Sequence, residues 1–405
     1  MRYDFHLTVW DDYFINKFIE FSLASQLAND NLVALAEVSD IHYHIYTARG
    51  SHKYFKQRIS SLEKYAKVHF HFFDEVFYKK NTLEHMIKNG NPAFIKHNVG
   101  RVTAQHMLSS LPENSAGVFI DSDLIISSGT FIRMHELRIL GKRAVLAILM
   151  RLNERTATPV LRKNFEVYLQ PRNLVRLCID HMHPSYKSFF YDSAQPTSYM
   201  CQINWRVKNF EETQTGLITH GLFPSPLMVI PDQLSGDHSK NFFSTMDYDY
   251  VLKTIAKDED IYLSKSSDEI MISKMTTEAY RENNATADSI NVNNLAYFIF
   301  FNTNIRHRLF FDQSIFFIAN EEGNWDNVSN EAKEFIDNSY KTVERMMNHL
   351  PPNDPRMLAY LKSFLGPIGD FISPQLIDSY KKWLPKPDLS KSSLQFSEHL
   401  KNKLD

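Results

Sequence analysis

The chain has 405 residues, of which 43% are hydrophobic, so it is long enough to bury one large core or two smaller ones. Its 45 basic and 47 acidic residues are spread without long blocks of like charge, which argues against a nucleic-acid partner. The two cysteines form no disulfide framework, no run reaches the roughly 18 apolar residues of a membrane span, and the charged start is no secretory signal, so we expect a cytoplasmic protein.

Strand and helix patterns alternate through the first 126 residues. Strands are predicted at residues 5–10, 41–47, 68–73 and 117–126, and helices at residues 14–21, 55–66 and 92–111. Asp11 and Asp12 are candidates for the cap of the first helix. This order is typical of a mainly parallel sheet flanked by helices, in which ligands bind beyond the carboxyl ends of the strands.

The strand pattern at residues 117–126 is interrupted by Asp121 and Asp123. Two carboxylates one residue apart at the end of a buried strand lose hydration and repel each other, so they need a cation or hydrogen-bond donors between them. A metal site is therefore the leading interpretation, and its position at the carboxyl end of a strand favours it. The alternative is that the strand ends at Ile120 and that residues 121–123 form a solvated turn.

Four histidines occupy alternate positions of the second and third strand patterns: His42, His44, His69 and His71. Such a group could bind zinc. Without a carboxylate at ligand spacing, however, histidines with this period more often form the polar face of a sheet, and this is what we expect.

Further elements are predicted between residues 127 and 290. We expect a strand at 143–150, a helical stretch at 159–182 that breaks or restarts at Pro171, a long loop at 183–205, and a strand, turn and strand at 217–231. A long loop inside a compact domain often contacts substrate.

Two acidic segments follow, at residues 244–250 and 258–270. In the second, Ser266 or Ser267 would cap a helix whose first turn carries Asp268 and Glu269. Acidic residues in a first turn are ordinary, and a catalytic role is the alternative.

The region from residue 291 onward is aromatic and then helical. Amphipathic helices are expected at 331–350 and 355–365, packed on the sheet. Seven phenylalanines precede them: Phe298, Phe300, Phe301, Phe310, Phe311, Phe316 and Phe317. We expect these rings to be buried. The alternative is an exposed patch for a homodimer contact or a peripheral contact with the inner face of a membrane, where a lipid-linked acceptor would lie.

These elements, in this order, resemble glycosyltransferases of the GT-A fold, and more narrowly uncharacterised bacterial glycosyltransferase-like proteins encoded with surface-polysaccharide functions. The resemblance covers residues 3–275 and rests on the segments 5–10 (FHLTVW), 43–47 (YHIYT), 119–123 (FIDSD), 244–250 (STMDYDY) and 267–269 (SDE). It implies an α/β, Rossmann-like catalytic domain at 1–290, with a nucleotide-binding half at 1–126 and an acceptor half at 127–290. A mainly helical extension would occupy residues 291–405.

The resemblance implies a metal-dependent transferase that moves a sugar from a nucleotide sugar, with a UDP-sugar expected, to a hydroxyl of a glycan, lipid-linked or protein acceptor in bacterial polysaccharide biosynthesis. Asp121 and Asp123 would hold Mn²⁺ or Mg²⁺ on the donor diphosphate, with His220 as a third ligand, although the segment after His220 lacks the fuller motif of one retaining family. Further donor contacts are implied for Thr8, Val9, Trp10, Lys96, Asn98, Arg101 and Ser122. The candidates for the general base are Asp247, Asp249, Asp268 and Glu269.

Two other classes fit parts of the pattern. Haloacid-dehalogenase-like phosphatases also have a strand ending in Asp-Xaa-Asp, whose first aspartate is a nucleophile. Their motif usually lies near the chain start and continues Gly-Thr, whereas here it lies beyond residue 115 and continues with Leu124 and Ile125. The non-enzyme alternative is a catalytically inactive GT-A-like binding protein. The apposed Asp121 and Asp123 argue against it, because a scaffold gains nothing from two neighbouring carboxylates.

Overall fold

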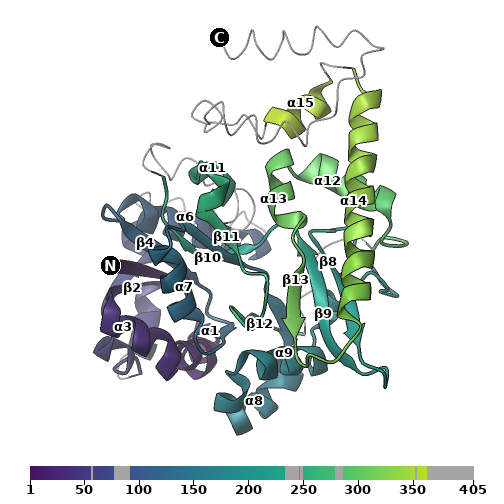
Figure 1. Ribbon diagram of the computed structural model, residues 1–405. Helices are drawn as coiled ribbons and strands as arrows, with labels where there is room; N and C mark the ends of the chain where they lie inside the picture. Colours follow the sequence, from purple (N-terminus) through teal and green to yellow (C-terminus); the bar gives the residue numbers. More distant parts are fainter. Residues whose placement is uncertain are drawn as a thin grey trace.

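The computed structural model describes residues 1–55, 58–76, 92–232, 246, 250–278, 286–351 and 354–362. A seven-stranded sheet lies at the centre of these residues (Figure 1). Its strands are, in spatial order, β11 (Ile261–Leu263), β6 (Ala144–Ala147), β10 (Ser225–Val229), β4 (Ser115–Ile120), β1 (Arg2–Thr8), β2 (Asp40–Thr47) and β3 (Lys67–Phe72). Only β10 runs antiparallel to its neighbours within this sheet. The prediction of a mainly parallel mixed sheet is therefore confirmed.

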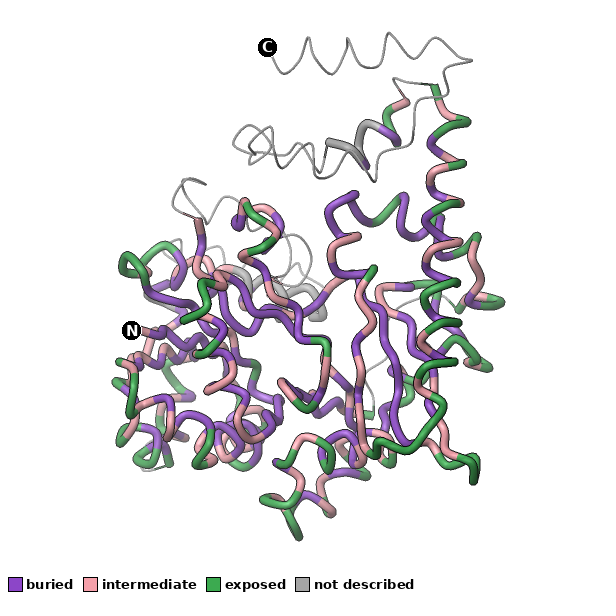
Figure 2. The backbone as a smooth tube through the Cα atoms, viewed as in Figure 1, coloured by how far each residue is buried: buried purple, intermediate pink, exposed green. Residues whose placement is uncertain are grey.

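The central strands of this sheet are buried on both faces, whereas the edge strand β3 is half-buried. All five central residues of β1 are buried, and β4 and β6 show similar runs. Near-continuous burial is expected of parallel strands that helices cover on both sides. Figure 2 shows this burial along the central strands, with the exposed residues on the surrounding helices and turns.

Helices connect and cover the strands. In the described ranges up to residue 260 they are α1 (Asp12–Lys17), η1 (Phe18–Ser22), α2 (Leu23–Gln26), η2 (Asn29–Val33), α3 (Ala34–Val38), η3 (Arg49–Tyr54), η4 (Leu62–Lys64), α4 (Phe73–Val76), α6 (Pro92–Ser109), α7 (Thr130–Ile139), α8 (Glu154–Tyr168), α9 (Pro171–Asp180), α10 (Pro184–Lys187), α11 (Val251–Thr254) and η8 (Asp258–Asp260). The predicted cap is present, because the Asp11 side chain accepts a hydrogen bond from the backbone N–H of Tyr13. Pro171 opens α9, as the break in the helical pattern predicted.

The prediction of a continuous α-helix at residues 55–66 is wrong. The described part of this segment contains 3₁₀ turns, with the N–H of Leu62 bonded to the carbonyl of Ile59 and that of Tyr65 to Leu62. Phe55, Ile59 and Leu62 are nevertheless buried. Two serines follow Ile59, and serine side chains compete with the backbone for hydrogen bonds, which favours turns over a continuous helix.

Two three-stranded sheets extend the structure. The first has the order β5 (Leu124–Ile126), β12 (Ile272–Thr276) and β7 (Met150–Asn153). The second has the order β13 (Ile315–Ile318), β9 (Gln214–Gly221) and β8 (Gln202–Lys208), all antiparallel. The predicted strand at 143–150 is thus two strands, β6 and β7, which belong to different sheets.

The C-terminal part packs on the second of these sheets. Its elements are α12 (Val292–Asn302), η9 (Ile305–His307), α13 (Arg308–Phe311), β13, α14 (Trp325–His349) and α15 (Pro355–Lys362). Strand β13 pairs with β9, so this part contributes a strand to a sheet that begins near residue 202. In Figure 1, α14 runs alongside β8 and β9, on the side of the molecule away from β1 and β2. None of the helices in the described ranges is both long and apolar enough to cross a membrane.

The buried guanidinium of Arg306 fixes this part to the segment around α11. It pairs with Asp258 at 3.0 Å and donates hydrogen bonds to the carbonyls of Leu252, Ile255 and Ala256. Because Arg306 is only 2% exposed, these acceptors would lose their partner inside the protein without it.

Most of the seven phenylalanines are buried, as expected. Phe298, Phe300, Phe310, Phe311 and Phe317 are all less than 9% exposed. Phe316 is half-buried. Phe301 is 54% exposed and stacks on the exposed ring of Tyr297 one helical turn earlier. Among the described residues, the alternative of an exposed aromatic patch therefore applies only to this pair.

The four histidines of β2 and β3 form a stacked ladder on one face of the sheet. Neighbouring imidazole rings lie 4.9–5.2 Å apart, and Nδ1 of His44 is 2.9 Å from Nε2 of His71. The ladder ends on β1 at Asp4, whose carboxylate is 2.9 Å from Nε2 of His44. Burial alone would raise the pKa of Asp4, but hydrogen bonds from His44, Arg2 and Ser115 lower it well below its usual range.

Candidate functional site

Asp121, Ser122 and Asp123 form the turn that joins β4 to β5. The strand ends at Ile120, as the solvated-turn alternative required, but Ser122 and Asp123 are each only 7% exposed. The backbone of this turn is anchored, because the carbonyl of Asp121 accepts a hydrogen bond from the Ser22 hydroxyl and that of Asp123 accepts one from the N–H of Met275. The carboxylate of Asp121 is the exposed member, at 61%.

The ammonium group of Lys274 lies at the two carboxylates, where the sequence predicts a cation. Its Nζ is 2.5 Å from Oδ2 of Asp121 and 3.7 Å from Oδ1 of Asp123. Burial alone would lower the pKa of Lys274, but the two carboxylates outweigh it and raise this pKa above its usual value. The lysine is therefore charged and offsets part of the repulsion between the two aspartates.

Strand β12 brings Lys274 to this position. Lys274 lies opposite Leu124 of β5 on one side and opposite Arg151 of β7 on the other. Residues directly opposite each other in neighbouring strands project from the same face of the sheet. Arg151 is near enough that its charge lowers the pKa of Lys274. Two cationic side chains thus accompany the aspartates.

The end of β1 lies beside this turn. Leu7 of β1 is in register with Ile120 of β4, so the residues after each strand continue at the same edge of the sheet. Thr8 lies at this end, and its hydroxyl is 2.5 Å from that of Thr103 on α6. Val9 is buried, and its N–H bonds to the carbonyl of Tyr46. The half-buried ring of Trp10 meets Phe73 edge-on.

Side chains from α1 and α8 lie on another side of Asp123. Glu154, at the start of α8, accepts hydrogen bonds from the Tyr13 hydroxyl at 2.5 Å and from Nζ of Lys17 at 2.6 Å. Burial, the hydrogen bond to Glu154 and the negative charges of Glu154 and Asp123 all raise the pKa of Tyr13. Lys17 is 4% exposed, and the residues about one helical turn away on its face include Phe14 and Phe21.

Sequence reasoning missed Lys274, Arg151, Glu154 and Lys17. For Lys17 there was a signal, a lysine on an apolar helix face, because such a lysine needs a buried partner. Lys274 and Arg151 carried no local signal, since each is a single basic residue in a short strand.

Asp268 and Glu269 lie in a turn between β11 and β12, so the helix predicted to start there is wrong. The Ser266 hydroxyl does accept a bond from the N–H of Asp268, but the chain then enters β12. This local bond resembles a helix cap, and the pairing of β12 with β5 and β7 overrides it.

Both acidic side chains have basic partners. The carboxylate of Asp268 binds Arg172 through two nitrogens, at 3.0 and 2.8 Å. Glu269 accepts hydrogen bonds from Arg133 at 2.5 Å and from the Tyr262 hydroxyl at 2.7 Å. These contacts connect them to α9 and α7, and none connects them to the Asp121–Asp123 turn.

His220 is buried in β9 and uses both ring nitrogens. Nδ1 donates to the carbonyl of Phe311 at 2.7 Å, and Nε2 is 3.1 Å from the Ser314 hydroxyl. Burial lowers its pKa to about 4, so the ring is neutral at pH 7. Metal binding would break one of these hydrogen bonds.

Several predicted site residues lie outside what the structure describes. Asp247 and Asp249 fall in an undescribed segment. Residues 92–109 form α6, as predicted, but the side chains of Lys96, Asn98 and Arg101 are not among those described. Their roles stay predictions.

The donor atoms at the turn suit a hard divalent cation only in part. Asp121 and Asp123 supply carboxylate oxygens, which Mg²⁺ and Mn²⁺ prefer. In the described ranges, however, no three His, Cys, Asp or Glu side chains converge as a complete ligand set. Further ligands would have to come from a substrate and water, as is usual for Mg²⁺ on phosphates.

His6 provides a test of the packing beneath the site. Its Nε2 is 3.1 Å from the Thr103 hydroxyl, and burial lowers its pKa to about 3. The native ring therefore stays neutral while the unfolded chain takes up a proton near pH 6.5, so acid favours unfolding. We expect His6 to lower the unfolding free energy by about 1.4 kcal/mol per pH unit below pH 6.5, until its native pKa is approached.

Urea unfolding at pH 7, 6 and 5 measures this effect. The His6→Gln variant, which keeps a polar group beside Thr103, is expected to lose that part of the pH slope. Equal slopes in the two proteins would show that native His6 is accessible to protons.

No family model matches this chain, and no curated protein matches its sequence. Among solved structures it is similar to mouse xyloside xylosyltransferase 1, with 13% identity, a TM-score of 0.27 and coverage of 41% of this chain and 60% of that chain. It is also similar to S. aureus TarS, with 10% identity, a TM-score of 0.29 and coverage of 94% and 50%. For TarS residues 1–349 the values are 9%, 0.30, 92% and 82%. The chain thus spans 60% and 50% of the first two structures.

Proposed function

We propose that this chain is a glycosyltransferase that moves a sugar from a nucleotide sugar, with a UDP-sugar as the expected donor, to an acceptor hydroxyl. The observation that carries the proposal is a group of two carboxylates and two basic side chains at the carboxyl edge of β4. It is formed by Asp121, Asp123, Lys274 and Arg151. In sheets of this type, ligands bind at such an edge. Basic side chains beside paired carboxylates suit a diphosphate with a divalent cation.

Asp121 and Asp123 would hold that cation, Mn²⁺ or Mg²⁺. When bound, it would offset the negative charge that develops on the departing nucleoside diphosphate. Lys274 would then lose Asp121 as its partner and be able to bind a phosphate oxygen instead. Thr8, Val9 and Trp10, at the neighbouring strand end, would border the nucleoside.

For the acceptor side, the proposal leaves out His220, because both of its ring nitrogens already have partners. Asp268 and Glu269 would have to release arginine partners before either could act as a base. Asp247 and Asp249 remain predicted candidates for the general base. A role in bacterial polysaccharide synthesis, with a glycan, lipid-linked or protein acceptor, extends the same proposal.

Calorimetry on the wild-type protein tests the donor. We would titrate UDP-, GDP- and ADP-sugars and the free nucleotides, each with Mn²⁺, with Mg²⁺ and with a chelator. The expected result is metal-dependent binding of one nucleotide class. If no nucleotide binds under any condition, the proposal fails, and hydrolysis of phosphosugars would then support the phosphatase alternative.

A further inference from the structure

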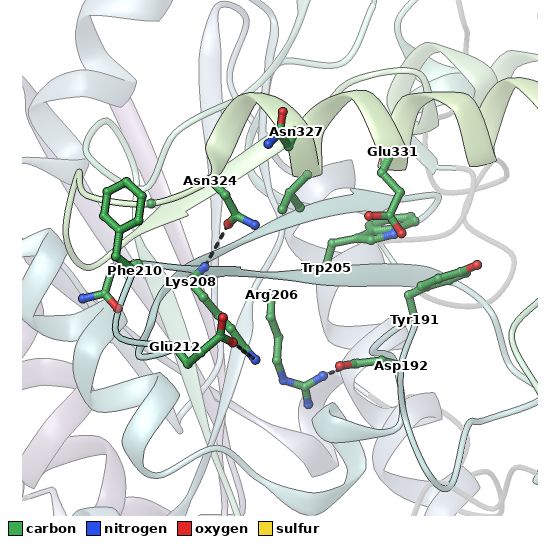
Figure 3. Close-up of a pocket in the computed structure, with 13 residues that line it drawn as sticks. Tyr191, Asp192, Trp205, Arg206, Lys208, Phe210, Glu212, Asn324, Asn327 and Glu331 are labelled. Carbon is green, nitrogen blue, oxygen red and sulfur yellow. Dashed lines mark hydrogen bonds and ion pairs between the residues drawn. The ribbon is translucent and has the colours of Figure 1, made fainter.

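A second site lies at the junction of β8, the turn that follows it and the start of α14. It is an open cavity of about 690 Å³ (Figure 3). Its lining includes Tyr191, Asp192, Trp205, Arg206, Asn324 and Glu331. None of these residues belongs to the group at Asp121 and Asp123, which lies on the turn between β4 and β5 and on β12 and β7.

The cavity lies along the outer edge of β8, the last strand of the sheet β13-β9-β8. At one end of this edge, the backbone of Asn204 bonds to Phe189 and Tyr191. At the other end, the backbone of Lys208 bonds to the N–H and the side chain of Asn324. In an antiparallel strand every second residue directs its backbone to the same side, so Arg206, midway between them, also faces this edge. A stretch of one residue is too short to add a peptide strand.

An aromatic ring is held in a fixed position in the cavity. Tyr191 stacks on Trp205 with a ring separation of 5.8 Å, and Phe335 meets it edge-on at 5.1 Å. Tyr191 is nevertheless 39% exposed, so it offers a flat apolar surface to a ligand. Phe210, in the turn after β8, is fully exposed and flanks the other end of the cavity in Figure 3.

The wall formed by α14 is also fixed. Gly216 of β9 allows the ring of Trp325, the first residue of α14, to pack against the sheet, because a side chain there would overlap that ring. Asn324 therefore presents its side chain beside β8, where it bonds the backbone of Lys208 at 3.1 Å. This wall of the cavity is therefore preformed.

The two basic side chains of the cavity, Arg206 and Lys208, are each paired with a carboxylate. Arg206 binds Asp192, and Lys208 binds Glu212 at 2.9 Å (Figure 3). Glu331 adds a third carboxylate, so the lining is slightly acidic and disfavours phosphates and nucleic acids. The polar groups of the lining include carboxylates, amides and a guanidinium, which are planar and can donate to or accept from two neighbouring hydroxyls at once. The buried indole N–H of Trp205 also has no partner in the described residues.

We propose that this cavity binds a neutral oligosaccharide. The apolar face of one sugar ring stacks on Tyr191, and its hydroxyls bond to the planar polar groups around Arg206 and Asn324. Because Tyr191 and Phe210 lie at opposite ends of the cavity, they favour binding of a chain of sugars over a single sugar. This proposal does not rest on the donor site, and it stands if the chain transfers no sugar.

The test is binding in the absence of nucleotide and metal. We would screen the wild type on an array of neutral oligosaccharides and then titrate maltohexaose, chitohexaose and the best array ligand by calorimetry. Tyr191→Ala is expected to weaken binding about tenfold, because one aromatic contact is lost, whereas Tyr191→Phe retains it. Tyr297→Ala, which removes an exposed tyrosine on α12, is the matched control and is expected to bind as the wild type does.

Three outcomes would overturn the proposal. They are no binding of any neutral oligosaccharide to the wild type, equal affinity of Tyr191→Ala and wild type, and binding only of an anionic probe such as a heparin hexasaccharide. Circular dichroism on each variant separates a lost contact from a lost fold. Nucleotide titrations on the same proteins are scored separately, so failure of the donor site would not be confused with failure of this one.

Discussion

Asp123→Ala is expected to abolish metal-dependent binding of the donor and to lower the transfer rate by about 1,000-fold, which corresponds to about 4 kcal/mol. Asp123 is the buried carboxylate of the pair, and its backbone is fixed by Met275, so the exposed Asp121 cannot take over its position. Calorimetry with the nucleotide sugar and Mn²⁺, together with kcat/KM for the acceptor reaction, measures both effects.

The variant should remain folded, because Lys274 keeps Asp121 as a partner at 2.5 Å. Asp180→Ala, which removes an exposed aspartate at the end of α9, is the matched control and is expected to behave as the wild type does. If Asp123→Ala still binds the donor with Mn²⁺ at wild-type affinity, the pair is not the metal site.

Lys274→Met is expected to change metal and donor binding in opposite directions. Without the ammonium group, the two carboxylates lose their internal counter-ion, so Mn²⁺ alone should bind at least about tenfold more tightly. A unit charge 4 Å away contributes on the order of 4 kcal/mol at an effective dielectric constant of 20, and the exposure of Asp121 reduces this. Donor binding should weaken, because the phosphate loses a cationic partner.

Thermal unfolding gives a readout that does not need turnover. We expect Lys274→Met to unfold at a lower temperature than the wild type in chelator and to recover more stability than the wild type when Mn²⁺ is added, because the metal replaces the missing charge. Lys67→Met, which removes an exposed lysine paired with Asp40, is the control. Equal Mn²⁺ affinities in Lys274→Met and wild type would mean that Lys274 does not compete with metal.

The two predictions also separate two roles of the same site. If Asp123→Ala loses donor binding as expected but Lys274→Met binds the donor normally, the divalent metal ion holds the diphosphate without help from the lysine. If both variants lose the donor while only Lys274→Met gains metal affinity, the lysine exchanges Asp121 for a phosphate oxygen.

Local patterns were sufficient for the first four strands and their order of connection. The apolar runs at residues 5–10, 41–47 and 68–73 correspond to β1, β2 and β3, and the run at 117–126 begins with β4, because alternation of strand and helix restricts a chain to few arrangements. The end of that last run is a separate strand, β5, which belongs to another sheet. Local patterns also placed Asp121 and Asp123 at the carboxyl edge of the sheet, since that position follows from strand direction alone.

Local patterns misled where a short-range bond imitates another structure. Ser266 caps Asp268 as it would cap a helix, yet the segment leads into β12. The apolar spacing at 55–66 matched a helix, yet the described part of that segment forms 3₁₀ turns that bury the same side chains. In both cases burial of the apolar residues was predictable and the backbone form was not, because several backbone forms can bury the same set of residues.

By itself, the sequence determined the mainly parallel sheet, the burial of most of the C-terminal phenylalanines and a carboxylate pair that needs a positive charge. Only the tertiary structure decided which described residue meets that need, because Lys274 reaches Asp121 from 153 residues away through the pairing of β12 with β5. It likewise decided that β8 is the last strand of its sheet and lies beside Tyr191 and α14. Periodicity in a chain records which side of an element is buried, whereas the partner across a sheet depends on strand order and register, which are set by contacts between distant segments.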